Sequence, residues 1–384
     1  MDFSFSEDQV GFQKLFKDFV KKEIEPITEK MDKEEYFPAD VIKKAGELGF
    51  LGMSIPEEYG GTGMGEVSAC LFNEEVAYSS PAVCTILGAH TGIACHSMYL
   101  GGTDEQKKKY LAPMARGEKL GAFALTEPTA GSDAAGIKTK AVRKGDKFVI
   151  NGSKIWITNG GVADVYIIYA NLEKTESSRG GITAFIAERG FPGLEVGTIE
   201  KHMGIHGSST AELVFDNLEV PVENMLGEEG GGFAVAMGAL NYGRLELGAG
   251  CVGIAKRCLH MSHDFAKQRV QFGKPIIKQQ VIQFKLAEMA TDLEAARLMV
   301  YNCAWLADQG KRFTKESAMV KLFCSRVANM CANEAVQIHG GMGYMSDYPV
   351  ERFYRDARIT EIYEGTSEIQ KSVIAMQLMR ERRS

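Results

Sequence analysis

Apolar positions at the start of the chain recur at helical spacing. Ser6 and Gln9 can form a capping box, in which each side chain accepts a hydrogen bond from the other residue's backbone N–H. The apolar positions that follow at i, i+3, i+4 and i+7 are Phe12, Leu15, Phe16 and Phe19. Glycine and proline separate further helix-like segments up to about residue 118. The pattern predicts a helical N-terminal domain over residues 1–119.

The pattern then changes to short runs rich in β-branched and aromatic residues. These runs cover residues 147–150, 154–158, 165–170, 181–187 and 211–215. Asn151-Gly152 separates the first two runs, and this dipeptide is the strongest short signal for a hairpin turn. We therefore expect a hairpin at Asn151-Gly152 within a middle β domain of barrel or sandwich type over residues 120–230.

Helical spacing returns after the glycine-rich segment 227–232 and continues over long stretches. The interruptions fall near residues 273–275, 309–310 and 340–344. This spacing predicts a C-terminal bundle of about four long helices over residues 231–384. The predicted fold class is therefore α+β and multidomain, in the order helical, β and helical.

Composition narrows the function classes. The 384 residues are 45% hydrophobic and 24% charged, as expected of a folded globular protein. The formal net charge of −6 argues against bulk binding of nucleic acid or anionic lipid. The sequence shows neither a signal peptide nor about 20 consecutive apolar residues, so we expect no membrane span and a cytoplasmic or equivalent reducing location.

Cysteine and histidine spacing gives no metal site. The eight cysteines are scattered without a C-x-x-C pair, so we interpret them as reduced packing residues. His202 with His206, and His260 with His263, lack the H-E-x-x-H pattern and a third ligand. The expected metal content is therefore none.

Two irregular segments stand apart from this pattern. Residues 121–133 (GAFALTEPTAGSD) begin the β domain and are rich in turn formers and small residues. Such a loop can present backbone amides and hydroxyls to a ligand, although alone it could be a mere connection. Residues 337–352 (QIHGGMGYMSDYPVER) precede Arg355-Asp356 and the segment 362–366 (IYEGT).

Together these segments resemble the two signature regions of the acyl-CoA dehydrogenase family. Further blocks match in the same order: residues 151–158 (NGSKIWIT), Val220-Pro221 with Leu226-Gly227, and residues 267–274 (KQRVQFGK). The resemblance extends from Phe3 to the C-terminal helix, and it implies FAD as cofactor and an acyl-CoA thioester as substrate.

The resemblance also assigns the FAD contacts by position. Those expected at the isoalloxazine ring are Phe123, Leu125, Thr126, Trp156 and Thr158, and those near the pyrophosphate and thioester are Gly131 and Ser132. Contacts expected from a neighbouring subunit are Arg269, Phe272, Gln279, Gln337, Gly340 and Gly341. Thr366 and Glu368 match contacts to the chain's own FAD. The shared site implies a homo-oligomer, usually a tetramer.

Glu364 matches the catalytic base of the family. A thioester α-proton is weakly acidic, so its removal needs a positioned carboxylate, and burial beside flavin should raise the pKa of that carboxylate. Flavin then accepts a hydride from the β carbon, which no side chain can do. The competing interpretation is a carboxylate that stabilises a helix N-terminus.

Substrate contacts follow from the same resemblance. The expected contacts are Ser132, Asn241, Arg244 and Gly365. Asn241 departs from an aspartate that is common in the family at this position. Some relatives place the base at the position of Gly243, where glycine cannot act, and we interpret Glu246, one turn later, as a packing or solvated side chain. His90 is either a packing residue or an influence on chain-length preference.

Other features point to packing or to related chemistries. Residues 248–253 (GAGCVG) fit the dinucleotide pattern G-x-G-x-x-G, but they lie within a helical stretch, so we expect close helix packing. The predicted function is dehydrogenation of a short- or medium-chain acyl-CoA, with branched and alicyclic acyl groups also open. Electrons would pass to an electron-transferring flavoprotein. The alternatives are an enoyl-CoA reductase, an acyl-CoA oxidase or a non-catalytic binding module on the same fold.

Overall fold

The N-terminal part of the chain is helical, as the periodicity predicts. The computed structural model describes residues 4–175 and 178–381. Its first α-helices are α1 (Glu7–Phe19), α2 (Thr28–Glu34), α3 (Ala39–Glu47), α4 (Gly65–Ser79), α5 (Pro81–Gly88), α6 (His96–Gly101), α7 (Asp104–Gln106) and α8 (Ala112–Ala115). A π-helical segment, Ala89–Cys95, joins α5 to α6. The predicted capping box is confirmed, because Ser6 and Gln9 exchange both hydrogen bonds at the start of α1.

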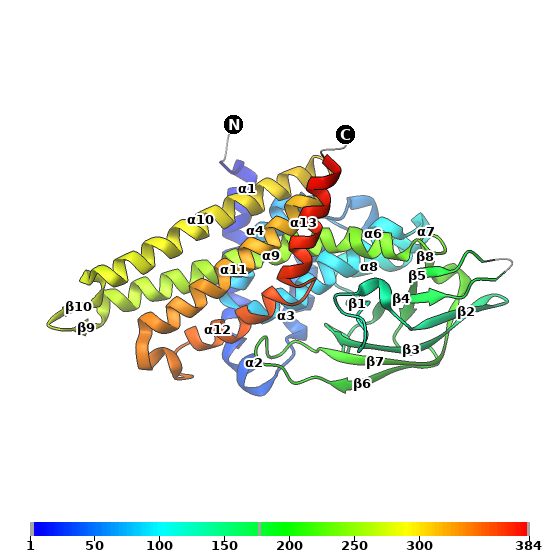
Figure 1. Cartoon of the computed structure of the whole chain (residues 1–384), viewed down its shortest axis with the longest axis horizontal. Coiled ribbons are helices and arrows are strands. Elements are labelled where there is room, and N and C mark those ends of the chain that lie inside the picture. The colour runs from blue at the N-terminus through cyan, green and yellow to red at the C-terminus, as the bar shows by residue number, and fades with distance from the viewer. Residues whose placement is uncertain (1–3, 176–177, 382–384) are drawn as a thin grey trace.

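The middle part is one mixed sheet that lies beside the helices (Figure 1). Its strands are β1 (Gly121–Ala124), β2 (Lys140–Lys144), β3 (Lys147–Ile157), β4 (Val165–Leu172), β5 (Gly181–Glu188), β6 (Leu194–Ile199), β7 (Ala211–Pro221) and β8 (Met225–Leu226). The order is β6-β7-β3-β2-β4-β5-β8, with β1 paired to β4. β1 and β2 run parallel to β4, and the other pairs are antiparallel.

The predicted hairpin at Asn151-Gly152 is wrong. Residues 147–157 form one continuous strand, β3, whose pairing with β7 shifts register between Ile150 and Gly152. Gly152 has φ +145°, and an added Cβ there would lie 2.6 Å from Oγ1 of Thr139. The dipeptide therefore makes a bulge, in which glycine also permits close approach of the backbone. The hairpin lies earlier in the chain, between β2 and β3, where Lys144 pairs with Lys147 across the turn.

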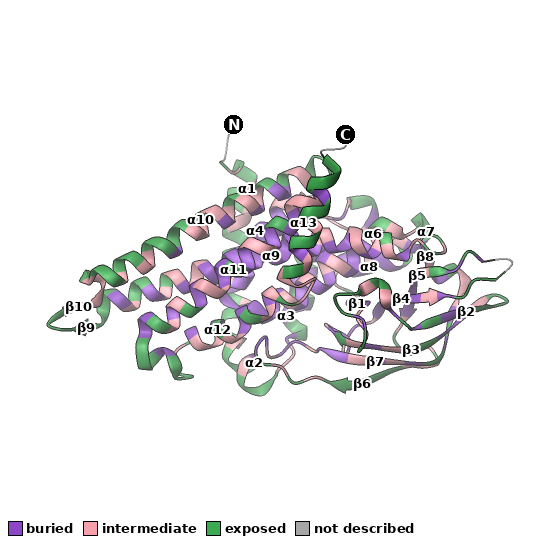
Figure 2. Cartoon of the chain, in the orientation of Figure 1, coloured by how far each residue is buried: buried purple, intermediate pink, exposed green. Residues whose placement is uncertain are grey.

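The C-terminal part contains the four predicted long helices. They are α9 (Gly232–Gln268), α10 (Gln280–Asp308), α11 (Thr314–His339) and α13 (Ser367–Glu381). The short helix α12 (Val350–Arg358) lies between α11 and α13, and the β9–β10 hairpin (Val270–Gln271 and Lys274–Pro275) joins α9 to α10. Buried residues concentrate along α9, α11 and α4 in Figure 2, so α9 is the central helix of the molecule.

Glycines allow α9 to pack closely against its neighbours. A Cβ at Gly250 would lie 2.9 Å from the Cys84 sulfur, and one at Gly253 would collide with the Glu74 carbonyl oxygen. The G-x-G-x-x-G pattern thus serves helix packing, as predicted. All eight cysteines are buried free thiols. None of the described helices has the length and apolar character needed to cross a membrane.

Candidate active site

A cavity of about 1360 Å³ lies where the sheet meets the two helical parts. Single ligands usually occupy about 300–1,000 Å³, so this cavity has room for a dinucleotide and a second molecule. Its walls come from β1 and the loop after it, from β3, from the β6–β7 connection, from α5 and α9, and from the segment that leads into α13.

The structure brings together most of the predicted site residues. Those that line the cavity are Phe123, Leu125, Thr126, Gly131, Ser132, Trp156, Thr158, Asn241, Arg244, Glu364, Gly365 and Thr366. Trp156 is 60% exposed and has φ +58°, an unusual conformation for a bulky residue. A large ring held in this way on a cavity wall is available to a flat ligand.

The remaining predicted residues do not line the cavity. Arg269 and Phe272 lie at the β9–β10 hairpin, where Phe272 is 93% exposed, and Gln279 precedes α10. Gln337 is at the end of α11, and Gly340 and Gly341 begin the 3₁₀ turn after it. Glu368 is exposed on the first turn of α13. Figure 1 places the hairpin at the end of the bundle far from the sheet.

Glu364 lines this cavity from a strained backbone conformation. Its φ is +53°, which costs free energy for any residue with a Cβ and which tends to occur at functional sites. Three side chains hold the turn: Arg244 Nε donates to the Glu364 carbonyl (3.1 Å), Lys321 Nζ donates to the Gly365 carbonyl (2.8 Å), and Gln370 Nε2 donates to both. Lys321 and Gln370 lie outside the signature segments, so the sequence alone did not point to them.

Burial perturbs the Glu364 carboxyl group. Its Oε2 atom is buried and has no hydrogen-bond partner. Burial raises the pKa of Glu364 to about 7, against the opposing charges of Arg244 and Lys321. Burial likewise lowers the pKa of Lys321 to about 8. At neutral pH a large fraction of Glu364 is therefore able to accept a proton.

Gly243 makes room for that carboxyl group. A Cβ at Gly243 would lie 2.6 Å from Glu364 Oε2 and 2.5 Å from the Ile93 side chain. These distances give a structural reason for glycine at position 243. A larger residue would displace the Glu364 side chain.

The loop after β1 is held by a buried ion pair that the sequence analysis missed. Lys154 Nζ donates to Glu127 Oε1 (2.7 Å) and to the Leu125 carbonyl (3.0 Å), and the Lys154 side chain is fully buried. The Glu127 carboxylate also accepts from the backbone N–H groups of Lys138 and Thr139. The pair therefore ties β3 to both ends of the loop that carries Gly131 and Ser132. Lys154 was visible in the NGSKIWIT block, but a lysine is usually exposed.

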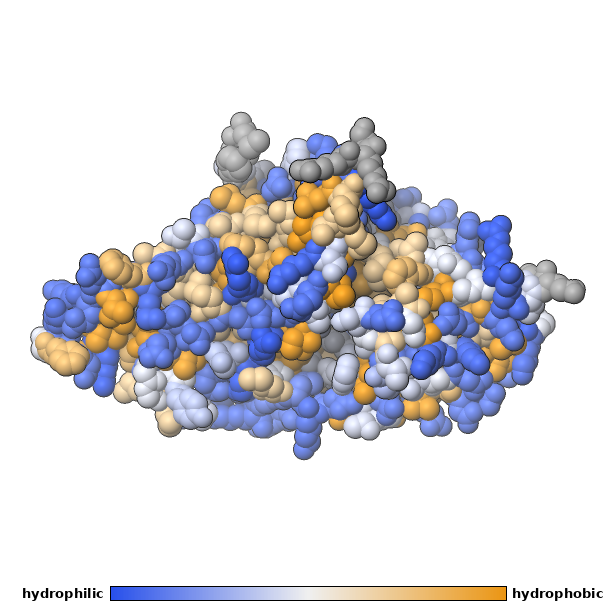
Figure 3. All heavy atoms as spheres, in the orientation of Figure 1, coloured by the Kyte–Doolittle hydropathy of each residue, from blue (hydrophilic) through white to orange (hydrophobic). Residues whose placement is uncertain are grey.

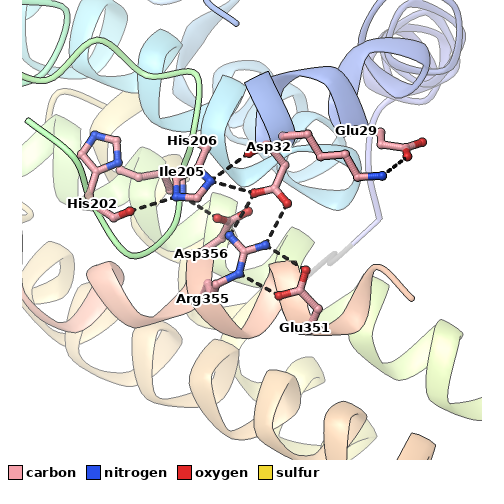
Figure 4. A network of polar contacts seen from close by, with 9 residues as sticks. Glu29, Asp32, His202, Ile205, His206, Glu351, Arg355 and Asp356 are labelled. Atoms are coloured by element: carbon pink, nitrogen blue, oxygen red, sulfur yellow. Dashed lines mark hydrogen bonds and ion pairs between the residues drawn. The ribbon is translucent and has the colours of Figure 1, made fainter. Parts of the chain in front are cut away.

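A second polar network, drawn in Figure 4, contributes residues to the cavity lining. The Arg355 guanidinium binds the Asp32 carboxylate through two hydrogen bonds of 2.9 and 2.8 Å, and it also binds Glu351. His206 contacts Asp32 and the His202 carbonyl. The network joins α2, the β6–β7 connection and α12, and it fixes the positions of Arg355 and His202 on the cavity wall.

His90 and Glu246 are both buried, but only Glu246 lines the cavity. No three His, Cys, Asp or Glu side chains in the described part of the chain form a metal site. His90 is fully buried, accepts from the Gly121 N–H, contacts the Met114 carbonyl and does not line the cavity, so its role is packing. Of the two alternatives for Glu246, the solvated one is wrong, because the residue is only 1% exposed; its buried side chain packs in the interior and also lines the cavity.

The cavity fits FAD. Arginines that line it, including Arg312, Arg358 and Arg380, provide guanidinium groups suited to phosphate oxygens. The loop around Gly131 offers backbone close to the cavity, and nothing lies within 4 Å of a Cβ built at Gly131. Trp156 and Phe123 supply ring surfaces on the same wall.

Comparison with known proteins identifies the family. Three family models match: the N-terminal domain of acyl-CoA dehydrogenase at residues 6–118, the middle domain at 122–218 and the C-terminal domain at 230–379. An acyl-CoA dehydrogenase of Bacillus subtilis is 50% identical over 97% of this chain and 98% of its own length. An NADH-dependent acryloyl-CoA reductase of Anaerotignum propionicum is 48% identical over 99% of this chain and 96% of its own length.

Solved structures agree with this result. Butyryl-CoA dehydrogenase of Megasphaera elsdenii superposes with a TM-score of 0.95 at 45% identity, covering 99% of this chain and 100% of that one. A chain described as electron transferring flavoprotein of Acidaminococcus fermentans, in work on flavin-based electron bifurcation, gives 0.96 at 46% identity over 99% and 100%. An acyl-CoA dehydrogenase of Bacillus anthracis complexed with FAD gives 0.94 at 40% identity over 99% and 68%. The chain therefore belongs to the acyl-CoA dehydrogenase family, whose FAD-dependent members dehydrogenate acyl-CoA thioesters.

Proposed function

We propose that Glu364 is the base that removes the α-proton of an acyl-CoA thioester in this chain. The observation that carries the proposal is the Glu364 carboxyl group, which faces the cavity from strained backbone with Oε2 unpartnered and its pKa raised to about 7. A base works best when its pKa lies near the working pH. A carboxylate that only stabilised a helix end would need neither the strain nor the burial.

The other cavity residues would hold the reacting molecules. Phe123, Trp156 and Thr158 line the cavity and would hold a flat ring, and we assign Ser132 and Gly365, which also line it, to the thioester. FAD, when bound, supplies the two-electron acceptor that no side chain provides. Arg244 donates to the Glu364 carbonyl and so holds the turn that carries Glu364. We propose that it affects CoA binding indirectly, by positioning this turn.

The substrate we propose is a short- or medium-chain acyl group, with room for branched or alicyclic groups. Small residues line the inner end of the cavity: Ala77, Gly88, Ala89 and Gly250. Relatives named for short acyl groups, such as the Megasphaera elsdenii butyryl-CoA dehydrogenase, support the same size range.

The experiment is an anaerobic titration of the purified protein with butyryl-, octanoyl-, isobutyryl- and cyclohexanecarbonyl-CoA, followed by the visible absorbance of the flavin. Bleaching by a member of this panel supports the proposal and defines the substrate class. Flavin that is bleached by NADH and reoxidised by acryloyl-CoA would instead favour the reductase direction suggested by the Anaerotignum relative. Bound flavin that none of these compounds bleaches would contradict the proposal.

Electron transfer and assembly complete the proposal. We propose that an electron-transferring flavoprotein accepts the electrons, with rapid reoxidation by oxygen as the mark of an oxidase.

We also propose a homotetramer in which Arg269, Phe272 and Gln279 of one subunit complete the FAD site of another. Large apolar side chains are exposed along α10 and α13, among them Val281, Phe284, Trp305, Met376 and Met379, and apolar atoms are visible over this part of the surface in Figure 3. Light scattering tests the assembly, and Phe272→Ser should lower FAD retention.

A further inference from the structure

One carboxyl group stands out at the mostly apolar inner end of the cavity. Glu246 on α9 is 1% exposed, yet its side chain lines the cavity together with Ala77, Cys84, Gly250 and Ile254. Its Oε1 atom is buried and has no hydrogen-bond partner. An unpaired polar atom in such a place loses free energy unless a ligand or water satisfies it.

The other carboxyl oxygen is firmly held. Thr91 Oγ1 donates to Glu246 Oε2 over 2.7 Å, and Asn73 Nδ2 donates to the same oxygen over 3.3 Å. Thr91 belongs to the π-helical segment Ala89–Cys95, and such segments are frequent at functional sites. The two contacts fix the carboxyl group so that Oε1 is the free atom.

The surroundings keep this carboxyl group neutral. Burial raises the pKa of Glu246 to about 8, and the charge of Glu66 on α4 acts in the same direction. His96 on α6, which forms an ion pair with Glu66 (3.2 Å), lowers the pKa of Glu246. Glu364 raises this pKa by a smaller amount. The remaining titratable groups that interact with Glu246 are buried thiols whose own pKa values are raised: Cys70, Cys84 and Cys95.

The position of Glu246 along α9 sets where a ligand group would meet it. Gly243 lies directly against the Glu364 carboxyl group. Glu246 follows three residues later, about 4.5 Å along the helix and close to the same face. That distance corresponds to roughly three to four carbon–carbon bonds beyond the carbon from which Glu364 takes its proton. If a bound acyl chain runs along α9 away from Glu364, its carbon 5 or 6 would lie beside the free Oε1 atom.

We propose that Glu246 is a specificity-determining residue that binds a hydroxyl group carried on carbon 5 or 6 of the acyl chain. This inference rests on the proposed function, because it takes Glu364 as the base. A hydroxyl group can donate and accept, so it satisfies Oε1 whichever oxygen of the neutral carboxyl group carries the proton. An unsubstituted alkyl chain leaves Oε1 without a hydrogen-bond partner and shields it from water. Its kcat/KM should therefore be about 10- to 100-fold lower than that of the hydroxylated chain.

The test compares kcat/KM for hexanoyl-CoA, 5-hydroxyhexanoyl-CoA and 6-hydroxyhexanoyl-CoA at pH 7 with the wild-type enzyme. We expect at least one hydroxylated substrate to be preferred about tenfold or more over hexanoyl-CoA. Glu246→Leu should abolish that preference and improve hexanoyl-CoA turnover, whereas Glu246→Gln, which can still donate and accept, should retain it. If Glu246→Leu does not fold, the wild-type comparison and Glu246→Gln still decide.

Thr85→Val is the matched control. Thr85 is another polar residue of the inner end, but its hydroxyl group already donates to the Pro81 carbonyl, so its loss should leave the hydroxyl preference unchanged. A cavity of about 10 Å³ beside Glu246, about the size of one water molecule, offers a competing partner for Oε1. If wild type uses hexanoyl-CoA as well as both hydroxylated substrates, or if Glu246→Leu leaves the ratio unchanged, Oε1 binds only water and the inference is wrong. Loss of flavin bleaching by every acyl-CoA would instead overturn the proposed function.

Discussion

Replacing Glu364 by glutamine removes an ionisable group from the cavity and keeps the size of the side chain. Burial raises the pKa of Glu364 from 4.5 to about 7. A shift of about 2.5 pKa units corresponds to about 3 kcal/mol, reduced to the extent that solvent in the cavity screens the charge. The folded protein binds this proton more tightly than the unfolded chain does. The stabilisation is therefore complete below pH 4.5 and is lost as the pH rises through 7.

The variant should therefore gain stability relative to wild type as the pH rises. We expect the free energy of unfolding of Glu364→Gln, minus that of wild type, to increase by up to about 3 kcal/mol between pH 4.5 and pH 8. Denaturant titrations at pH 4.5, 6, 7 and 8, with saturating FAD in each, measure this difference. A difference that stays constant with pH would contradict the burial of the ionised carboxylate.

The same variant tests the role of Glu364 in catalysis. An amide cannot accept the α-proton, and a positioned base typically contributes about 10²- to 10⁴-fold, so flavin reduction should slow by at least about 100-fold. Anaerobic stopped-flow absorbance with butyryl-CoA gives the rate, and flavin content and acyl-CoA binding should be unchanged. Glu361→Gln is the control, because Glu361 pairs with Arg358 and lies outside the cavity lining. Turnover of Glu364→Gln within tenfold of the wild-type rate would falsify the assignment of the base.

Three further variants test the support around the base. Lys321→Met removes a positive charge that lowers the pKa of Glu364. The acid limb of the kcat/KM profile, which follows ionisation of the base, should therefore move to higher pH. An unmoved limb would show that the charge of Lys321 does not affect Glu364. Gly243→Ala should lower kcat about tenfold or more while the protein remains folded, because the new Cβ would displace the Glu364 carboxyl group; Gly11→Ala, at a position with nothing within 4 Å, should have no effect on kcat, and equal rates for the two variants would refute the steric argument. Lys154→Met should destabilise the protein by about 3–5 kcal/mol in denaturant titrations, because it leaves Glu127 buried without its cation; a loss below about 1 kcal/mol would show that the backbone N–H groups alone satisfy the carboxylate.

The regular elements were predictable because their patterns are local. Helical spacing located the long helices of the bundle, and β-branched runs located β4, β5 and β7. Strand β6 was missed because it lies at the edge of the sheet and is almost entirely exposed, so it carries no alternation. The Asn151-Gly152 hairpin failed for a related reason. Whether that dipeptide turns or bulges is decided by pairing with β7, which is more than 60 residues away in sequence.

The site was only partly predictable. The resemblance supplied Glu364 and the ring contacts, and the structure gathers them in one cavity, but the roles of these residues stay predictions. The domain limits at residues 119 and 230 also stay predictions. Lys154 was not singled out, and Glu246 was left open as a packing or solvated side chain, because charged side chains are normally exposed. A buried charge is recognised only through partners that the fold brings from distant segments, as Glu127 meets Lys154.

Helix α9 joins these observations, because the residues on one of its faces decide what the cavity can hold. Gly243 leaves space for the Glu364 carboxyl group, and one turn later Glu246 occupies the wall with a carboxyl group of its own. Another turn on, Gly250 leaves space again beside Cys84. Along one face of this helix, the residue beside Glu364, the polar residue Glu246 and the small residue Gly250 thus follow one another at intervals of about one turn. Substitutions on this face should therefore alter substrate choice without altering the fold, provided that side-chain volume is conserved.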